Sequence, residues 1–262
     1  MNITQEATNS VAITIAAAQS TSIPLDIAAN VLEHLRFIEA AADLGVQWLV
    51  FPELSLTGYE LVAMPELVLH AEHMLLAPLC EASRRTGMAM TVGAPVDANS
   101  TLPAIGAITL RPDGQHSVYR KFHLHEGEKA FASPGLAAVH LQTIGATRIA
   151  SAICADTNAP SQAASAAQAG ADVYAAGVLT SETGYAAEAP LWQGYARDHR
   201  MAVVIANHGG PSGNYVSAGK SAIWDADGRC IASATGLGDW LVMATPESAL
   251  GNGDSNRGHA RA

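Results

Sequence analysis

Short runs of apolar residues alternate with longer segments of helical periodicity along most of the chain. Short, fully apolar runs are typical of buried strands, whereas apolar residues that recur every three or four positions indicate amphipathic helices. The pattern predicts strands at 11–19, 48–53, 88–96, 104–114, 116–122, 171–179 and 201–208. It predicts helices at 25–45, 66–86, 160–170 and 187–199.

Two further segments predict hairpins. One turns at Gly145, and its second arm leads to Cys154; the other spans 220–235 around an Asp-Gly turn. Hairpins placed between strand–helix–strand units favour mixed sheets, so we expect an α/β fold with two sheets packed face to face and helices outside. No shift in composition divides the chain. We therefore predict one domain over 1–262, with its core at about 11–245 and a flexible tail at 247–262.

Composition and charge narrow the classes of function. Hydrophobic residues make up 49% of the 262 positions, enough for one substantial core. A net charge of −10 argues against nucleic-acid binding, which depends on Lys and Arg neutralising phosphates. No apolar run reaches the roughly 18–20 residues that span a bilayer, and no secretory signal pattern opens the sequence. Three cysteines without a CxxC motif disfavour disulfides and structural zinc, so we expect a cytoplasmic protein.

Three polar residues follow predicted strands and could carry chemistry. Glu53 follows "WLVFP", Lys121 closes "HSVYRK", and Cys154 closes "RIASAIC". Taken singly, each has an ordinary explanation as a surface charge or a small buried thiol. Taken together, the three residue types could catalyse hydrolysis. A desolvated carboxylate becomes a base near neutrality, a thiol beside it becomes a nucleophile, and a Lys stabilises the negative charge that develops.

The segments around these residues resemble the nitrilase superfamily of carbon–nitrogen hydrolases. The similarity lies in "FPELSLTGYE", "YRKFHLHEGEKAFASPG", "ICADTNAPSQAASAAQAGADVY" and "NHGGPSGNYVSAGKSAIWDADG", which occur in the family's order over about 11–245. The resemblance implies an αββα sandwich that assembles into a homodimer or higher homo-oligomer. It also implies that Glu53 is the general base, Lys121 the charge stabiliser and Cys154 the nucleophile, with no cofactor.

The resemblance suggests supporting residues as well. Many family members carry a second Glu after the Lys, for which Glu128 is the candidate and Glu126 the competitor. By the same resemblance, Tyr59 would lie near the pocket, and the backbone N–H of Ala155 would donate to the oxyanion. An ordinary packed Tyr remains the alternative reading of Tyr59.

The sequence departs from the family where many relatives carry an aromatic residue after the Cys. Here Ala155 follows the Cys, which lowers the case for a nitrile substrate because several true nitrilases have Trp there. We therefore predict that the substrates are a small amide and water and that the products include ammonia, released through a Cys thioester. Hydrolysis of an N-carbamoyl amine or amino acid is the alternative, and a nitrile is the third candidate.

Other classes of function remain open at this stage. "HLHEGE" places His123 and His125 near two glutamates, which could bind zinc or iron, but no further ligand is identifiable, so we predict no metal. A serine hydrolase is disfavoured because no GxSxG motif occurs, and "NHGGPSGNY" lacks a phosphate-binding pattern. A catalytically silent binding subunit with the same fold would require a changed Glu, Lys or Cys, and all three are present.

Overall fold

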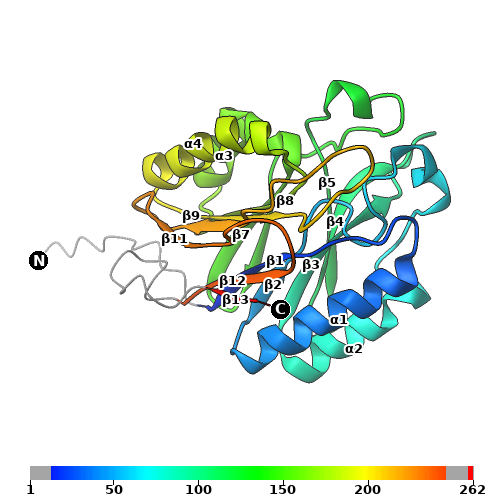
Figure 1. Ribbon diagram of the computed structural model, residues 1–262, viewed down its shortest axis with the longest axis horizontal. Helices are drawn as coiled ribbons and strands as arrows, with labels where there is room; N and C mark the ends of the chain where they lie inside the picture. The colour runs from blue at the N-terminus through cyan, green and yellow to red at the C-terminus, as the bar shows by residue number, and fades with distance from the viewer. Residues whose placement is uncertain (1–12, 246–258, 262) are drawn as a thin grey trace, which may run out of the picture.

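The computed structural model describes residues 13–245 and 259–261. Two mixed β-sheets pack face to face, and helices cover their outer faces (Figure 1). This confirms the expected αββα sandwich. The candidate residues Glu53, Lys121 and Cys154 directly follow strands or the short segments after them, at the strand ends.

The first sheet has seven strands in the order β13-β12-β1-β2-β3-β4-β5. Their bounds are β1 Ile15–Gln19, β2 Trp48–Val50, β3 Ala89–Val96, β4 Ala104–Leu110, β5 His116–Arg120, β12 Trp240–Ala244 and β13 His259–Arg261. Strand β2 runs parallel to both β1 and β3, and the other neighbours are antiparallel.

The second sheet has six strands in the order β11-β10-β9-β8-β7-β6. Their bounds are β6 His140–Ile144, β7 Thr147–Ile153, β8 Val173–Val178, β9 Ala202–Asn207, β10 Ala222–Trp224 and β11 Cys230–Ser233. Strands β7, β8 and β9 are mutually parallel neighbours. The carboxyl ends of parallel strands are the usual place for a site in an α/β sheet, and Glu53 and Cys154 follow β2 and β7.

Four α-helices flank the sheets in the described part of the chain: α1 Ile27–Asp43, α2 Ala77–Thr86, α3 Pro160–Gln168 and α4 Glu182–His199. Helices α1 and α2 cover the first sheet, and α3 and α4 cover the second (Figure 1). The Asp26 side chain caps α1, and Gly45 follows it with a positive φ of 72°, as predicted for the residue that ends this helix.

Two sequence predictions for helices need correction. The helix expected over 66–86 begins only at Ala77, because the preceding segment is extended at Leu69, which bridges to Val96 and donates its N–H to the Pro95 carbonyl at 2.8 Å. The helix expected at 187–199 begins earlier, at Glu182, where the Ser181 side chain caps it.

The sequence analysis missed one strand near the end of the chain and expected a flexible tail after it. Strand β12 is absent from the predicted strands although it pairs with β1 along its length. Most of the expected tail lies outside the described residues. Its described part, His259–Arg261, pairs with β12 as strand β13 and so differs from a flexible tail. No helix in the described ranges is long and apolar enough to cross a membrane.

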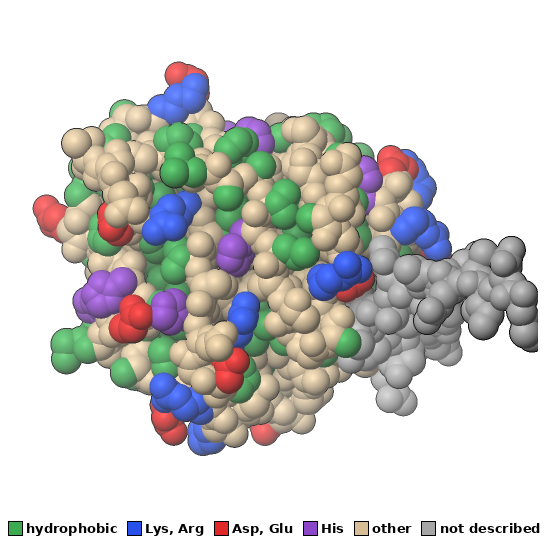
Figure 2. Space-filling view, turned by 180° about the vertical axis from the view of Figure 1, so that it is seen from behind, with side chains coloured by type: hydrophobic (Ala, Val, Ile, Leu, Met, Phe, Trp, Pro, Cys, Tyr) green, Lys and Arg blue, Asp and Glu red, His purple; other side chains and the backbone are tan. Residues whose placement is uncertain are grey.

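The layer between the sheets is built from apolar side chains, most of them small or branched, together with the ring of Trp48. Ile15, Ala17, Trp48 and Val50 come from the first sheet, and Ile149, Val173, Ala175 and Val204 come from the second. On the outer surface, Lys and Arg side chains are scattered rather than gathered on the face that Figure 2 shows.

Candidate active site

The loop after β2 carries Glu53 into the space between the two sheets. Its backbone passes so close to Gly93 of β3 and Gly177 of β8 that a Cβ at either glycine would clash with it. Leu54, directly after the glutamate, adopts a positive φ of 50°, which is costly for a leucine. A strained residue and two close glycine contacts fix the direction of the Glu53 side chain, which is buried.

A buried polar network holds this loop from α1. His34 Nδ1 lies 2.6 Å from the Asn30 carbonyl, so this nitrogen donates, and Nε2 accepts from Ser55 Oγ at 3.0 Å. Ser55 Oγ in turn accepts the Gly93 N–H at 3.1 Å. Burial lowers the pKa of His34 to about 4, which keeps the ring neutral and this pattern fixed at neutral pH.

The end of β9 fixes the same loop from the opposite side. His208 Nε2 donates to the Glu53 carbonyl oxygen at 2.7 Å. Burial lowers the pKa of His208 to about 4, so this ring is also neutral. The two histidines act through backbone atoms and neighbouring side chains of the loop, and each comes from a segment far from it in sequence. Sequence reasoning did not identify either one.

Lys121 lies at the centre of a fully buried ion cluster. Its Nζ is 2.6 Å from Glu53 Oε1 and 2.6 Å from Glu128 Oε1, and all three side chains are 0% exposed. The second oxygen of Glu53, Oε2, is buried and has no hydrogen-bond partner among the described residues. It is therefore free to interact with a substrate or to accept a proton.

The environment shifts the proton affinities of these groups. Burial raises the pKa of Glu53 from 4.5 to about 7, against the opposing charge of Lys121. Burial alone lowers the Lys121 pKa, but the surrounding anions outweigh it, Glu53 most of all, so the net shift is upward. Burial raises the pKa of the Cys154 thiol well above its ordinary value, and the Glu53 charge adds to that shift. A protonated thiol near a carboxylate that titrates around neutrality suits general-base chemistry.

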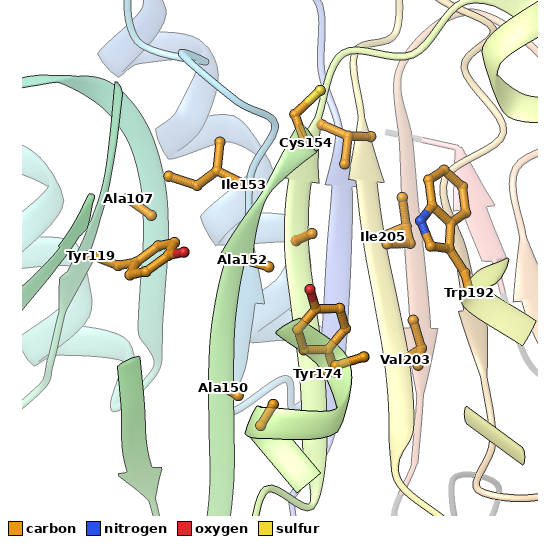
Figure 3. Close-up of a cluster of buried hydrophobic side chains, with 14 of the residues drawn as sticks. Ala107, Tyr119, Ala150, Ala152, Ile153, Cys154, Tyr174, Trp192, Val203 and Ile205 are labelled. Atoms are coloured by element: carbon orange, nitrogen blue, oxygen red, sulfur yellow. The ribbon is translucent and has the colours of Figure 1, made fainter. Parts of the chain in front are cut away.

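Cys154 occupies a strained turn at the end of β7. Its φ is 44°, and it begins the 3₁₀ turn η4, Cys154–Asn158. Figure 3 shows its sulfur directed away from the hydrophobic cluster that includes Tyr174 and Val203. The sulfur lies 3.8 Å from His125 Nε2 and 3.8 Å from the Leu179 carbonyl oxygen. Non-glycine residues with positive φ concentrate at functional sites because the fold must hold them there.

Asp156 ties the cysteine turn to the segment after Lys121. Its Oδ2 accepts from the Ile153 N–H at 2.9 Å and from the Tyr119 hydroxyl at 2.8 Å. Its Oδ1 accepts from the His123 N–H at 2.7 Å. This fully buried carboxylate is a positioning group. In the sequence, only its position two residues after the cysteine points to this aspartate.

The structure distinguishes the two supporting glutamates. Glu128 is buried in the ion cluster, where its Oε1 accepts from the Tyr59 hydroxyl at 2.6 Å and its Oε2 from the His125 N–H at 2.8 Å. Glu126 points to solvent and pairs with Lys129. Of the two, Glu128 is therefore the carboxylate that contacts Lys121, and the Tyr59 hydroxyl lies beside it.

Ala155 and the two histidines of "HLHEGE" complete the surroundings. Ala155 is 8% exposed and directly follows the cysteine, so its backbone lies at the site. The His123 ring faces Asp156, whereas the His125 ring faces the Cys154 sulfur. Within 13–245 and 259–261, no three His, Cys, Asp or Glu side chains are grouped so that they could hold a metal ion.

Comparisons with known proteins identify a family for the sequence. The sequence model described as carbon–nitrogen hydrolase matches residues 14–245. A protein named "Nitrilase" from Pyrococcus abyssi is 30% identical over 144 residues, which are 53% of this chain and 55% of that protein. The chain thus matches about half the length of this relative.

Solved structures share the fold. An amidase of the nitrilase superfamily from Nesterenkonia AN1 gives a TM-score of 0.82 at 24% identity, covering 92% of this chain and 93% of that one. A form of the same amidase in complex with butyramide also gives 0.82 at 24% identity, covering 93% and 94% of the two chains.

Proposed function

Because this chain belongs to the carbon–nitrogen hydrolase family, we propose that it hydrolyses a small amide to a carboxylic acid and ammonia. Cys154 is the nucleophile, Glu53 the general base and Lys121 the charge stabiliser. The observation that carries the proposal is the buried ion cluster around Lys121 Nζ, set close to a thiol on a strained turn. Breaking such a cluster is costly, and it contributes little to stability compared with apolar packing. A catalytic role therefore explains the buried ion cluster better than a contribution to stability does.

The first half-reaction forms a thioester. The Cys154 sulfur attacks the amide carbon, and its proton passes to Glu53. The oxyanion of the tetrahedral intermediate accepts hydrogen bonds from Lys121 and from the Ala155 N–H. The carbon–nitrogen bond then breaks, and the proton held by Glu53 leaves with ammonia. The net change is one new carbon–sulfur bond and one broken carbon–nitrogen bond.

The second half-reaction consumes water. Glu53 takes a proton from a water molecule, whose oxygen attacks the thioester carbon. The carbon–sulfur bond breaks, and the proton returns to the sulfur, which regenerates the thiol. Glu128 contacts neither reacting atom in this scheme. It holds Lys121 in place and is itself held by Tyr59.

An amide is favoured over a nitrile by two observations. Ala155 stands where several nitrile-cleaving relatives have Trp. The fold neighbours from Nesterenkonia are amidases, one solved with butyramide and another with acrylamide added at its active-site cysteine. The curated relative named "Nitrilase" makes the nitrile the natural competitor to include in a test.

The test measures ammonia release by purified protein from matched pairs such as butyramide and butyronitrile, together with an N-carbamoyl amine. We expect amide turnover to exceed nitrile turnover by orders of magnitude and to disappear in Cys154→Ala. Equal rates of ammonia release from the amide and the nitrile would refute the proposed preference for amides. Undiminished ammonia release by Cys154→Ala would refute the nucleophile. Failure of the folded wild-type protein to cleave any amide would indicate a silent fold.

A further inference from the structure

A cavity of about 730 Å³ opens beside Tyr59. Aromatic and apolar side chains form most of its wall, among them Tyr59, Leu61, Phe131 and Tyr215. Its volume lies within the range of about 300–1,000 Å³ that is common for small-molecule sites. No residue of the buried ion cluster lines it, so the proposed reaction does not by itself account for it.

The turn at 212–215 holds one wall of this cavity in place. Ser212 and Tyr215 exchange two backbone hydrogen bonds, each of 3.1 Å, and Ser212 Oγ accepts the Tyr59 N–H at 2.8 Å. The rings of Tyr59 and Tyr215 then meet edge to face with centroids 5.5 Å apart. The aromatic wall is therefore preformed, and binding a ligand there would not require these rings to be ordered first.

Glu60 is the one charged side chain in the wall of the cavity, as far as the described residues show. It is half-buried and has neither an ion pair nor a side-chain hydrogen bond within 13–245 and 259–261. A lone carboxylate among aromatic faces attracts a cation by direct charge and through the rings.

Tyr59 joins the cavity to the reacting groups. One part of its side chain lines the cavity, while its hydroxyl donates to Glu128 Oε1 at 2.6 Å, next to Lys121. Burial and the charges of Glu53 and Glu128 raise the pKa of this phenol, which places it within electrostatic reach of the cluster. Tyr59 is therefore shared by the wall of the cavity and the surroundings of the reacting groups, which makes the two neighbours across this residue.

We propose that this cavity binds a protonated amine at the far end of the substrate, with Glu60 as its counter-ion and Tyr59, Phe131 and Tyr215 around it. The inference rests on the proposed function and adds the substrate class, an aliphatic amide with a terminal ammonium group. An amide with a terminal carboxylate would meet Glu60 and no lysine or arginine among the described residues of the wall.

The test compares 5-aminopentanamide, hexanamide and the monoamide of adipic acid, three amides of similar length whose far ends are cationic, neutral and anionic. We expect kcat/KM to be at least about tenfold higher for the cationic amide than for the neutral one, equivalent to about 1.4 kcal/mol, and lowest for the anionic one. Glu60→Gln should lower the cationic-to-neutral ratio about tenfold. Glu66→Gln removes the same charge from an exposed position outside the cavity and should keep the wild-type ratio.

Each outcome decides the proposal. A wild-type ratio near one, or a ratio that Glu60→Gln leaves unchanged, would overturn it. If no amide in the series is hydrolysed, the proposed reaction fails for these compounds, and calorimetry on Cys154→Ala decides the cavity separately. Tighter binding of 5-aminopentanamide than of hexanamide, lost on adding Glu60→Gln, would support the ammonium site, and equal binding would refute it.

Discussion

Two ion pairs from one short segment of the chain differ in almost everything except distance. Lys129 Nζ lies 2.5 Å from Glu126 Oε2, and these side chains are 57% and 88% exposed. Lys121 Nζ lies 2.6 Å from Glu128 Oε1, and both side chains are 0% exposed. The exposed pair is screened by solvent, and such pairs contribute about 0–1 kcal/mol. The comparison teaches that burial, rather than contact distance, decides what an ion pair does.

The buried cluster also holds one positive charge against two carboxylates, Glu53 and Glu128. Removing charges from water costs several kcal/mol for each ion, and apolar side chains of the same size often serve stability equally well. The cluster therefore concentrates charge and shifts proton affinities at one place, which the exposed pair cannot do. The predictions for Lys121 and Glu53 below pair each change in the cluster with the matching change at the exposed pair.

The largest effect is expected for Lys121→Met. It leaves two buried carboxylates without their cation, which should lower the free energy of unfolding by about 3–5 kcal/mol. It also removes an oxyanion donor, for which about 2.7–4 kcal/mol of transition-state stabilisation is typical. Chemical denaturation and turnover per folded molecule measure the two effects. Lys129→Met should change neither by more than about 0.5 kcal/mol. Equal effects of the two variants would remove the distinction between the pairs.

Glu53→Gln should come next. The amide keeps the volume of the side chain but cannot take the thiol proton, so turnover should fall by about 10²–10⁴-fold. Adding this change to Cys154→Ala should cost almost nothing more, because groups that act as one unit are not additive. Glu126→Gln is the matched control and should retain wild-type turnover. Near-normal turnover in folded Glu53→Gln would mean that this carboxyl only caps a strand end.

Tyr59→Phe should have a smaller effect. It removes one donor to Glu128 while keeping the ring, and hydrogen bonds to charged groups are worth about 1.5–3 kcal/mol. Since Tyr59 acts through Glu128 and Lys121, we expect kcat to fall by roughly ten- to a hundredfold. Stopped-flow or steady-state rates on butyramide would measure this. A loss confined to the melting temperature would assign Tyr59 a structural role only.

The pH dependence gives the mildest test. With the pKa of Glu53 raised to about 7, the base form is lost as pH falls through 7, so kcat/KM should decline below that pH. The stability of the folded protein should increase, rather than decrease, as pH falls through the same range. Between the ordinary value of 4.5 and about 7 the folded protein holds more protons than the unfolded chain, so the free energy of unfolding falls as pH rises through this range. Glu53→Gln should flatten both profiles, and Glu126→Gln should flatten neither.

The candidate residues at strand ends could be singled out from the sequence. Glu53, Lys121 and Cys154 each interrupt an apolar run, and strands that end at one edge bring such residues together. The choice between Glu126 and Glu128 could not be made from spacing. It depends on a 3₁₀ turn, η3 (Glu126–Glu128), at whose start the His125 N–H donates to Glu128 and holds this side chain inward.

The residues that position the site left almost no sequence signal. His34 and His208 act on the loop that carries Glu53 from elements that are remote in sequence, and Asp156 accepts hydrogen bonds largely from backbone N–H groups. Such contacts depend on the three-dimensional packing of segments rather than on a local pattern. The helix predicted over 66–86 fails for a related reason, because Leu69 is buried by bridging to β3 and not by lying on a helix face.

The most direct test of the account is the intact mass of the protein quenched during turnover of butyramide. A Cys thioester requires a transient increase of about 70 Da, the mass of a butyryl group replacing one proton, located on the peptide that contains Cys154. The adduct should be absent from Cys154→Ala. Steady hydrolysis with no acyl adduct, or an adduct on any other residue, would contradict the assignment of the nucleophile.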